Sequence, residues 1–271
     1  MPDRAGQVCV ITGAASGIGA GLAEHAASLG MQVWAADVDR QGLEALQSRC
    51  QSLAGTCQLT EVDVRDSKAL ESLAESVFEQ FGRVDLLFNN AGVLVDGKSW
   101  ERSDADWRWS LEVNIMGVVN GLRSFIPRML RQDCPGRIIN TASIGGLLGG
   151  SAFLAPYQAT KHAIVALTES LAAELEQESA PLSASVLCPG EVATGIWESD
   201  RLREPPEHNV LNSEPEQAFH DTVAGMVAAG LTPAQFAERV FTALEEDNFW
   251  ILPQTEFKPL LEQRNQQILD A

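Results

Sequence analysis

Short apolar runs alternate along the chain with longer segments in which apolar residues recur every three or four positions. The short runs, rich in β-branched residues, predict strands at 8–12, 33–36, 57–62, 84–88, 136–141, 182–187 and 249–252. The longer segments predict helices at 20–29, 41–53, 67–81, 104–131, 157–178 and 233–247. Because strand and helix alternate, we expect an α/β fold with a doubly wound, seven-stranded parallel sheet and helices on both faces.

The periodicity weakens after about residue 190. Residues 191–230 contain Pro205-Pro206 and many acids, and we expect an irregular lid or mobile loop there. The tail at 254–271 is longer than a final strand requires, and its apolar residues could pack over a pocket mouth or on a neighbouring subunit. With no internal repeat, and no linker before the lid, the pattern predicts one domain, 1–271, that carries this lid and this tail.

Composition then removes several classes of protein. The 37 acidic residues outnumber the 19 basic ones, and the resulting net charge of −18 disfavours nucleic acids and anionic membranes as partners. No apolar run approaches the roughly 18 residues of a membrane helix, and the N-terminus has no secretory layout. Five widely spaced cysteines without a C-x-x-C pair predict neither a disulfide scaffold nor a metal site. We expect a reduced, cytoplasmic protein, whose acidity fits either an ordinary surface or a salt-adapted host.

A glycine-rich loop joins the first predicted strand to the first helix. In this position Gly13 permits a tight turn, Gly17 lets the backbone approach a pyrophosphate, and Gly19 allows close helix–sheet packing. Three glycines alone are a weak signal, since an ordinary turn has them too, but the strand–loop–helix context is the one that a Rossmann-type nucleotide site requires. The predicted contacts from this loop are Gly13, Ser16, Gly17, Ile18 and Gly19.

Asp37 ends the second predicted strand, 24 residues after Gly13. A carboxylate at this point can accept hydrogen bonds from the adenosine ribose and would repel a 2′-phosphate. The glycine loop carries no Lys or Arg, so NAD is favoured over NADP, although Arg40 could rescue a phosphate. The alternative for Asp37 is a solvated turn residue.

In these motifs the chain resembles the short-chain dehydrogenase/reductase family, in its single-domain branch of about 250 residues. The resemblance covers about residues 6–195 in order, plus the strand near residue 250. It rests on Thr-Gly-x-x-x-Gly-x-Gly at 12–19, Asn89-Asn90-Ala91-Gly92, Asn114, Ser143 at 14 residues before Tyr157, Tyr157-x-x-x-Lys161 and Pro189-Gly190.

Tyr157 and Lys161 lie four residues apart and therefore share one helix face. A phenol has a pKa of about 10, and a nearby ammonium should lower the pKa of Tyr157 so that it can act as general acid or base. Tyr157 is also the only tyrosine of the chain. The resemblance implies that Lys161 also holds the nicotinamide ribose, that Ser143 binds the substrate oxygen, and that Asn114 holds a proton-relaying water.

The resemblance implies further cofactor contacts. Asp63 and Val64 should flank the adenine, and Asn90 and Gly92 should border the adenosine ribose, although Asn90 could be a purely structural turn residue. The nicotinamide should meet Pro189, Val192 and Thr194. Glu191 could face either substrate or solvent.

The predicted substrate pocket is apolar. Its expected walls are residues 145–154, 93–95 and the lid with Ile196 and Trp197, and no arginine is placed where it would obviously clamp a carboxylate. Such walls suit a hydrophobic secondary alcohol or its ketone, with oxidation by NAD as the expected direction.

Two alternatives stay open. A 3-oxoacyl-thioester reductase would use NADPH and basic docking residues such as Arg128 and Arg131, but Ala172 and Ala173 are not basic and the net charge opposes an acidic partner. A non-catalytic NAD-binding regulator on the same fold is the second alternative. The long helices at 104–131 and 157–178 correspond to the family's usual dimer surface, so the resemblance implies a homotetramer or a homodimer.

Overall fold

The computed structural model describes residues 4–203 and 211–271, and its centre is a parallel sheet with the strand order β3-β2-β1-β4-β5-β6-β7. The seven-stranded, doubly wound prediction is confirmed. The strands are β1 (Val8–Thr12), β2 (Gln32–Asp37), β3 (Thr56–Glu61), β4 (Leu86–Asn89), β5 (Gly136–Thr141), β6 (Leu182–Leu187) and β7 (Trp250–Ile251).

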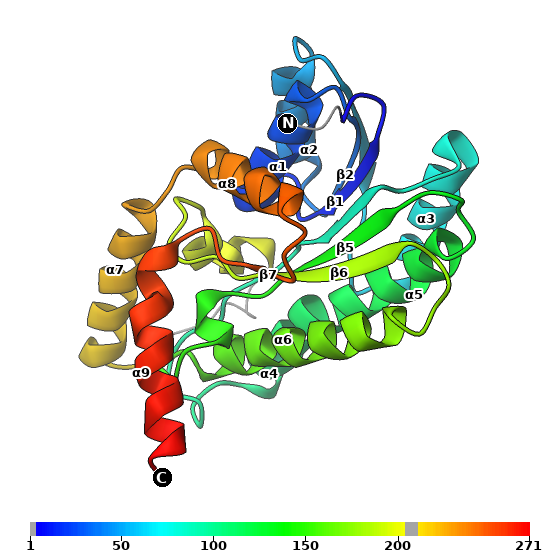
Figure 1. Cartoon of the computed structure of the whole chain (residues 1–271). Helices are drawn as coiled ribbons and strands as arrows, with labels where there is room; N and C mark the ends of the chain where they lie inside the picture. The colour runs from blue at the N-terminus through cyan, green and yellow to red at the C-terminus, as the bar shows by residue number, and fades with distance from the viewer. Residues whose placement is uncertain (1–3, 204–210) are drawn as a thin grey trace.

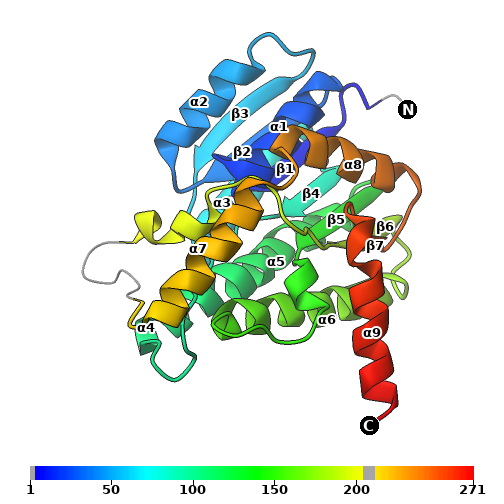
Figure 2. The same ribbon diagram turned by 90° about the vertical axis from the view of Figure 1, so that its left-hand side faces the viewer.

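Helices cover both faces of this sheet, as Figures 1 and 2 show. Helices α1, α2 and α8 lie on one face, and α3, α5 and α6 lie on the other, while α7 and α9 stand beyond the carboxyl ends of the strands. The helices are α1 (Gly17–Ser28), α2 (Arg40–Cys50), α3 (Ser67–Phe81), α4 (Asp104–Leu111), α5 (Gly117–Met129), α6 (Ala155–Leu175), α7 (Glu214–Ala228), α8 (Pro233–Glu245) and α9 (Lys258–Leu269).

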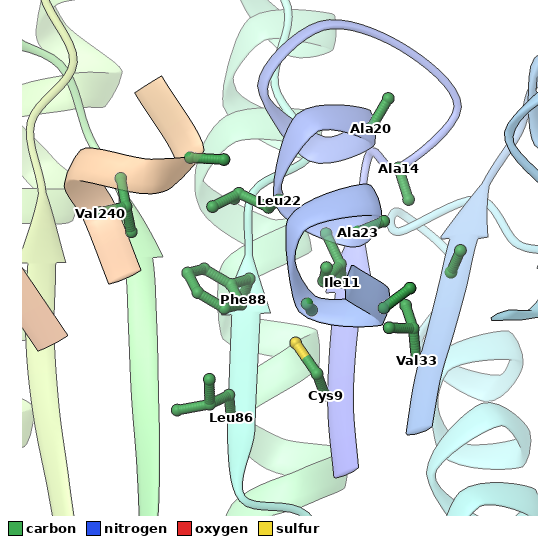
Figure 3. Packing of buried hydrophobic residues seen from close by; sticks show 14 of the residues in the cluster. Cys9, Ile11, Ala14, Ala20, Leu22, Ala23, Val33, Leu86, Phe88 and Val240 are labelled. Carbon is green, nitrogen blue, oxygen red and sulfur yellow. The ribbon is translucent and has the colours of Figure 1, made fainter. Parts of the chain in front are cut away.

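Each face has its own apolar core. Figure 3 shows the core under α1 and α8, where Leu22 and Val240 from the helices pack near Ile11 and Phe88 from β1 and β4. These four side chains are fully buried, so they fix α1 against the carboxyl half of the strands. The first turn of α1 is thereby held at the carboxyl ends of β1 and β4. These two strands are neighbours, but the chain continues from β1 to β2 on one side and from β4 to β5 on the other, and ligands bind at such a point in this type of sheet.

The single helix predicted at 104–131 needs a correction. The segment consists of α4, a π-helical turn (Glu112–Met116) and α5. A π-turn accommodates one extra residue, and here it turns the buried Asn114 side chain toward the loop after β4. The hydrogen bonds of Asn114 and tertiary packing decide this geometry, and the spacing of apolar residues does not predict it.

The irregular structure predicted for the lid at 191–230 is wrong for most of the described part of this segment. Residues Ile196–Leu202 form a 3₁₀ segment and residues Glu214–Ala228 form α7; the part at 204–210, including Pro205-Pro206, lies outside the described residues. The apolar residues at 219, 223, 226 and 227 have helical spacing, but they face a cavity instead of the core, which hid the pattern. The predicted tail forms a short 3₁₀ turn (Thr255–Phe257) followed by α9.

Candidate active site

A cavity of about 620 Å³ opens where the carboxyl ends of the strands meet the first turn of α1. The structure brings almost all predicted site residues to its wall. The lining residues include Gly13, Ser16, Gly17, Ile18, Gly19, Asp37, Asp63, Val64, Asn90, Gly92, Ser143, Tyr157, Lys161, Pro189, Val192 and Thr194. The exception is Asn114, which lies behind the wall.

The glycine loop is shaped as a phosphate cradle. A Cβ on Gly19 would lie 2.0 Å from the carbonyl oxygen of Gly13, so the helix and the loop approach each other more closely than any side chain permits. Gly13 and Gly17 have φ values of 67° and 54°, which favour glycine. The Ser16 side chain makes no capping hydrogen bond and the first turn of α1 has no acidic residue, so the N–H groups of this turn face the cavity without an acidic neighbour.

Asn90 braces this loop. Its Nδ2 donates to the carbonyl oxygens of Thr12 at 3.0 Å and of Gly13 at 3.3 Å, and its backbone N–H donates to Thr12 Oγ1 at 3.0 Å. These bonds tie the end of β4 to the end of β1. They favour the structural alternative for the Asn90 side chain.

Asp37 is held at the mouth of the cavity by two backbone donors. Its carboxylate accepts from the N–H of Ala15 at 2.9 Å and from the N–H of Asp39 at 3.0 Å. Burial raises the pKa of Asp37 above its ordinary value despite these bonds. Arg40 bonds to Glu44 at 3.0 Å and approaches Glu61 at 4.0 Å, so its charge is already shared with two carboxylates.

Asp63 and Val64 are part of the cavity lining too. Burial alone would raise the pKa of Asp63, but the hydrogen bonds from Arg65 outweigh it and lower that pKa. The nearest Arg65–Asp63 contact is 2.7 Å. Arg65 lines the cavity as well and was not among the predicted contacts.

Ser143, Tyr157 and Lys161 form a polar group on the cavity wall, in which Ser143 and Lys161 are buried and Tyr157 is half-buried. Ser143 Oγ accepts the N–H of Gly145 at 3.0 Å, which orients the hydroxyl just after β5. Lys161 Nζ donates to the carbonyl oxygen of Thr141 at 3.0 Å and lies 5.6 Å from the centre of the Tyr157 ring. Two helix positions four residues apart therefore share one face, as predicted.

The prediction that Lys161 lowers the pKa of Tyr157 is not met in this structure. Burial raises the pKa of Tyr157, and this outweighs hydrogen bonding with Ser143, which lowers it. Burial also lowers the pKa of Lys161 to about 8. Desolvation penalises the charged form of both groups, so the Lys161 ammonium is itself weakened as a partner for a phenolate.

Asn114 supports this group from behind. Its Oδ1 accepts the N–H of Val93 at 2.8 Å, and its Nδ2 donates to the Val93 carbonyl and to Thr160 Oγ1, both at 3.0 Å. Both amide hydrogens are therefore used within the protein. A Cβ placed on Gly92 would lie 3.3 Å from Lys161 Nζ and 3.4 Å from Asn114 Oδ1, so Gly92 leaves the space in which these two polar groups converge.

The remaining wall is largely apolar, as predicted, and it includes residues that were not named individually: four on α7 and Arg201, all within the predicted lid, and Gln158 on α6. Leu148, Leu154, Val93, Leu94, Ile196 and Trp197 come from the expected segments. Helix α7 adds Phe219, Val223, Met226 and Val227, while Gln158 follows Tyr157 on α6 and Arg201 comes from the 3₁₀ segment. The prediction was that no arginine is placed where it would obviously clamp a substrate carboxylate; Arg201 does line the cavity. Phe257 from the tail and Glu191 also line the cavity.

A buried carboxylate fixes the start of α7. Glu216 is fully buried and accepts Ser213 Oγ at 2.7 Å, the N–H of Lys98 at 3.0 Å and the N–H of Asn212 at 3.2 Å. The guanidinium of Arg102 lies 3.8 Å away. The hydrogen bond from Ser213, with others, lowers the pKa of Glu216, so this side chain stabilises the fold in its charged form.

Replacing Glu216 by Gln should reduce the free energy of unfolding by about 1–3 kcal/mol near neutral pH, since buried donors lose their charged acceptor. Because the folded-state pKa is lowered, this stabilisation is present above the unfolded pKa and is lost as the pH falls through the folded one. Urea unfolding at two pH values measures the difference. Glu214→Gln, on the exposed side of the same turn, is the matched control and should change little; equal effects of both variants would contradict the anchoring role.

In the described part of the chain, no helix is both long enough and apolar enough to span a membrane. Among the same residues, no three or more His, Cys, Asp or Glu side chains gather as ligands of a metal ion.

The Rossmann-type sheet, the glycine cradle and the Ser143, Tyr157 and Lys161 group together define an oxidoreductase. Residues 7–205 match the short chain dehydrogenase family, and the chain belongs to that family.

Three relatives illustrate the similarity. A short chain dehydrogenase/reductase from Burkholderia phymatum, solved in complex with NAD, is 37% identical with a TM-score of 0.93, covering 99% of this chain and 96% of that one. A CLA biosynthesis dehydrogenase/reductase from Lactiplantibacillus plantarum is 32% identical over 99% of this chain and 95% of its own length. A C alpha-dehydrogenase from a Sphingobium species is 32% identical over 100% of this chain and 88% of its own length.

Proposed function

We propose that this protein is an NAD-dependent dehydrogenase that interconverts a hydrophobic secondary alcohol and its ketone. The observation that carries the proposal is that one cavity joins the phosphate cradle, the Asp37 carboxylate and the Ser143, Tyr157 and Lys161 group. A non-catalytic regulator would need the first two but not the third. The relative solved with NAD supports the choice of cofactor.

The cavity fits NAD residue by residue. The N-terminal turn of α1 offers N–H groups to the pyrophosphate, and Asp37 offers its carboxylate to the adenosine ribose. Asp63 and Val64 are proposed to flank the adenine. Pro189, Val192 and Thr194 are proposed to meet the nicotinamide, which accepts or supplies the hydride when NAD is bound.

The proton chemistry is assigned to this chain's own side chains. Ser143 would hold the substrate oxygen by a hydrogen bond, and Tyr157 would take the hydroxyl proton in oxidation or return it in reduction. Lys161 would hold the nicotinamide ribose and favour the phenolate of Tyr157 while it is charged. We propose that Asn114 holds a water behind Lys161. Its Oδ1 accepts one hydrogen bond within the protein and has the capacity to accept another.

The substrate is proposed to be apolar over most of its surface. Leu148, Leu154, Phe219 and Met226 come from three segments and supply a wall without a charge. Against the thioester-reductase alternative, Arg128 is engaged with Glu71 at 2.7 Å and with the carbonyl of Ser124, so it is not free to dock an acidic carrier.

We also propose a cytoplasmic homotetramer or homodimer assembled through α4, α5 and α6. Leu111 and Met116 expose 39% and 44% of their surface on the α4–α5 segment, which suits burial by a second copy. Sedimentation at micromolar concentration tests this, and a mass equal to one chain would rule out the assembly.

Parallel fluorescence titrations with NADH and NADPH test the cofactor assignment. Trp34, three residues before Asp37, and the bound nicotinamide provide the signals. Tighter binding of NADH, followed by NAD-dependent oxidation of hydrophobic secondary alcohols, is the expected result. Tighter binding of NADPH would favour the reductase, and binding of neither would favour a protein without this activity.

The rate of alcohol oxidation should rise with pH. Oxidation needs ionised Tyr157, whose pKa is raised by burial, so kcat/KM should increase through the alkaline range, whereas ketone reduction should slow. The rise should become less steep above about pH 8, where Lys161 loses the charge that supports the phenolate. Rates in both directions, with circular dichroism to confirm folding at each pH, measure this; profiles independent of pH would contradict Tyr157 as the proton-transfer group.

A further inference from the structure

Arg201 presents an unused bidentate edge beside the cavity. It belongs to the 3₁₀ segment Ile196–Leu202, and its Nη1 donates to the carbonyl oxygens of Gly195 at 3.0 Å and Glu198 at 2.9 Å. Those two bonds use both hydrogens of Nη1, and the Nε–H and Nη2 hydrogens remain. Within the described residues, Arg201 forms no ion pair with a carboxylate, so its remaining donors and its charge are available to a ligand.

The segment that anchors Arg201 lies against the first turn of α1. A Cβ on Gly17 would lie 2.9 Å from Thr194 Cγ2, and a Cβ on Gly195 would lie 3.6 Å from Arg201 Nη1. Thr194 therefore touches the N-terminal turn of α1, and the next residue, Gly195, touches the Arg201 guanidinium. Gly17, Thr194 and Arg201 all line the same cavity.

The charged residues that line the cavity indicate which role remains for the Arg201 guanidinium. The Lys and Arg side chains among its described lining residues are Arg65, Lys161 and Arg201, against the acids Asp37, Asp39, Asp63 and Glu191. Arg65 pairs with Asp63, and Lys161 is bound to the Thr141 carbonyl at the Tyr157 end. Among these three described cations, Arg201 is therefore the one held neither by a carboxylate nor at the Tyr157 end, and its charge can add to the partial positive charge of α1.

We infer that Arg201 binds the cofactor pyrophosphate together with the N-terminal turn of α1. The planar Nε–Nη2 edge matches two phosphate oxygens, and the two carbonyl contacts hold the guanidinium in place for this bidentate bond. The inference rests on the proposed use of NAD. It adds that the 3₁₀ segment is a cofactor-binding element as well as part of the substrate wall.

Arg201→Gln tests the inference through binding alone. Since a charge-assisted bond is lost, the Kd of NADH and of ADP-ribose, each measured by fluorescence or competition, should rise about tenfold. Adenosine, which lacks the pyrophosphate, should compete equally well against both proteins. The affinity of the wild type should also fall more steeply with salt than that of the variant. Arg108→Gln, which removes one exposed positive charge on α4, is the matched control and should leave every Kd unchanged.

The outcomes separate the two proposals. If the wild type binds NADH and Arg201→Gln binds NADH and ADP-ribose equally well, Arg201 does not hold the pyrophosphate. The same conclusion follows if the variant changes only the KM of the alcohol substrate, or if it weakens adenosine as much as ADP-ribose. Failure of the wild type itself to bind NADH would instead remove the proposed function on which the inference rests.

Discussion

Tyr157→Phe is expected to lower kcat for alcohol oxidation by about three orders of magnitude while NADH affinity stays nearly unchanged. The substitution removes one hydroxyl, and with it the group proposed to accept the alcohol proton. The ring that lies 5.6 Å from Lys161 Nζ remains, so the wall of the cavity keeps its shape. No other phenol can substitute, since Tyr157 is the only tyrosine of the chain.

Steady-state rates, NADH titration and thermal unfolding together check this prediction. Ser143→Ala is the matched comparison, since it removes a neighbouring hydroxyl that is proposed to orient the substrate without moving its proton. It should cost less in kcat, and the pH dependence of oxidation should persist. If Tyr157→Phe keeps most of the activity, or if both variants lose the same rate with the same pH profile, proton transfer must belong to another group.

Much of this site could be predicted because a parallel sheet gathers the ends of its strands. Asp37 and Ser143 are more than a hundred positions apart, yet each follows directly from the end of a strand and therefore reaches the same cavity. The glycine loop could be located for the same reason, since it follows β1 and starts α1. The four-residue spacing on one helix likewise predicted that Tyr157 and Lys161 share a face.

The features that were missed depend on tertiary packing. Arg201 reaches the cavity because a 3₁₀ segment turns it back onto the Gly195 carbonyl, and no periodicity reports such a turn. Helix α7 covers a cavity, and its buried residue is the charged Glu216. It therefore lacks the apolar core-facing side by which a helix is predicted from sequence. The pKa of Tyr157 was predicted with the wrong sign because four-residue spacing reveals a neighbouring ammonium but not the depth of burial.

The second large effect concerns the choice between NAD and NADP. Asp37→Asn should narrow the preference for NADH over NADPH by about 10- to 100-fold, since it removes a negative charge that would face a 2′-phosphate in a partly desolvated site. The shape of the side chain is kept, and one oxygen still accepts a backbone N–H from Ala15 or Asp39. NADH itself should bind somewhat more weakly, because the amide is a poorer acceptor for the ribose hydroxyls than a carboxylate.

The same charge predicts a pH dependence with a definite sign. Because burial raises the pKa of Asp37, the carboxylate becomes neutral at a higher pH than a free aspartate does, and the wild-type preference for NADH should shrink as the pH falls toward that value. Asp37→Asn should show no such trend. Parallel titrations with NADH and NADPH at several pH values measure both effects.

Asp39→Asn is the control that makes the result specific. Asp39 lines the same cavity two residues away and caps α2 through its bond to the N–H of Gly42, which an asparagine can also make. Both variants remove one negative charge from one loop. A shift in the cofactor ratio confined to Asp37→Asn would assign the ribose contact to that side chain, whereas equal shifts would show that the general field of the acidic loop, and not Asp37, discriminates against the phosphate.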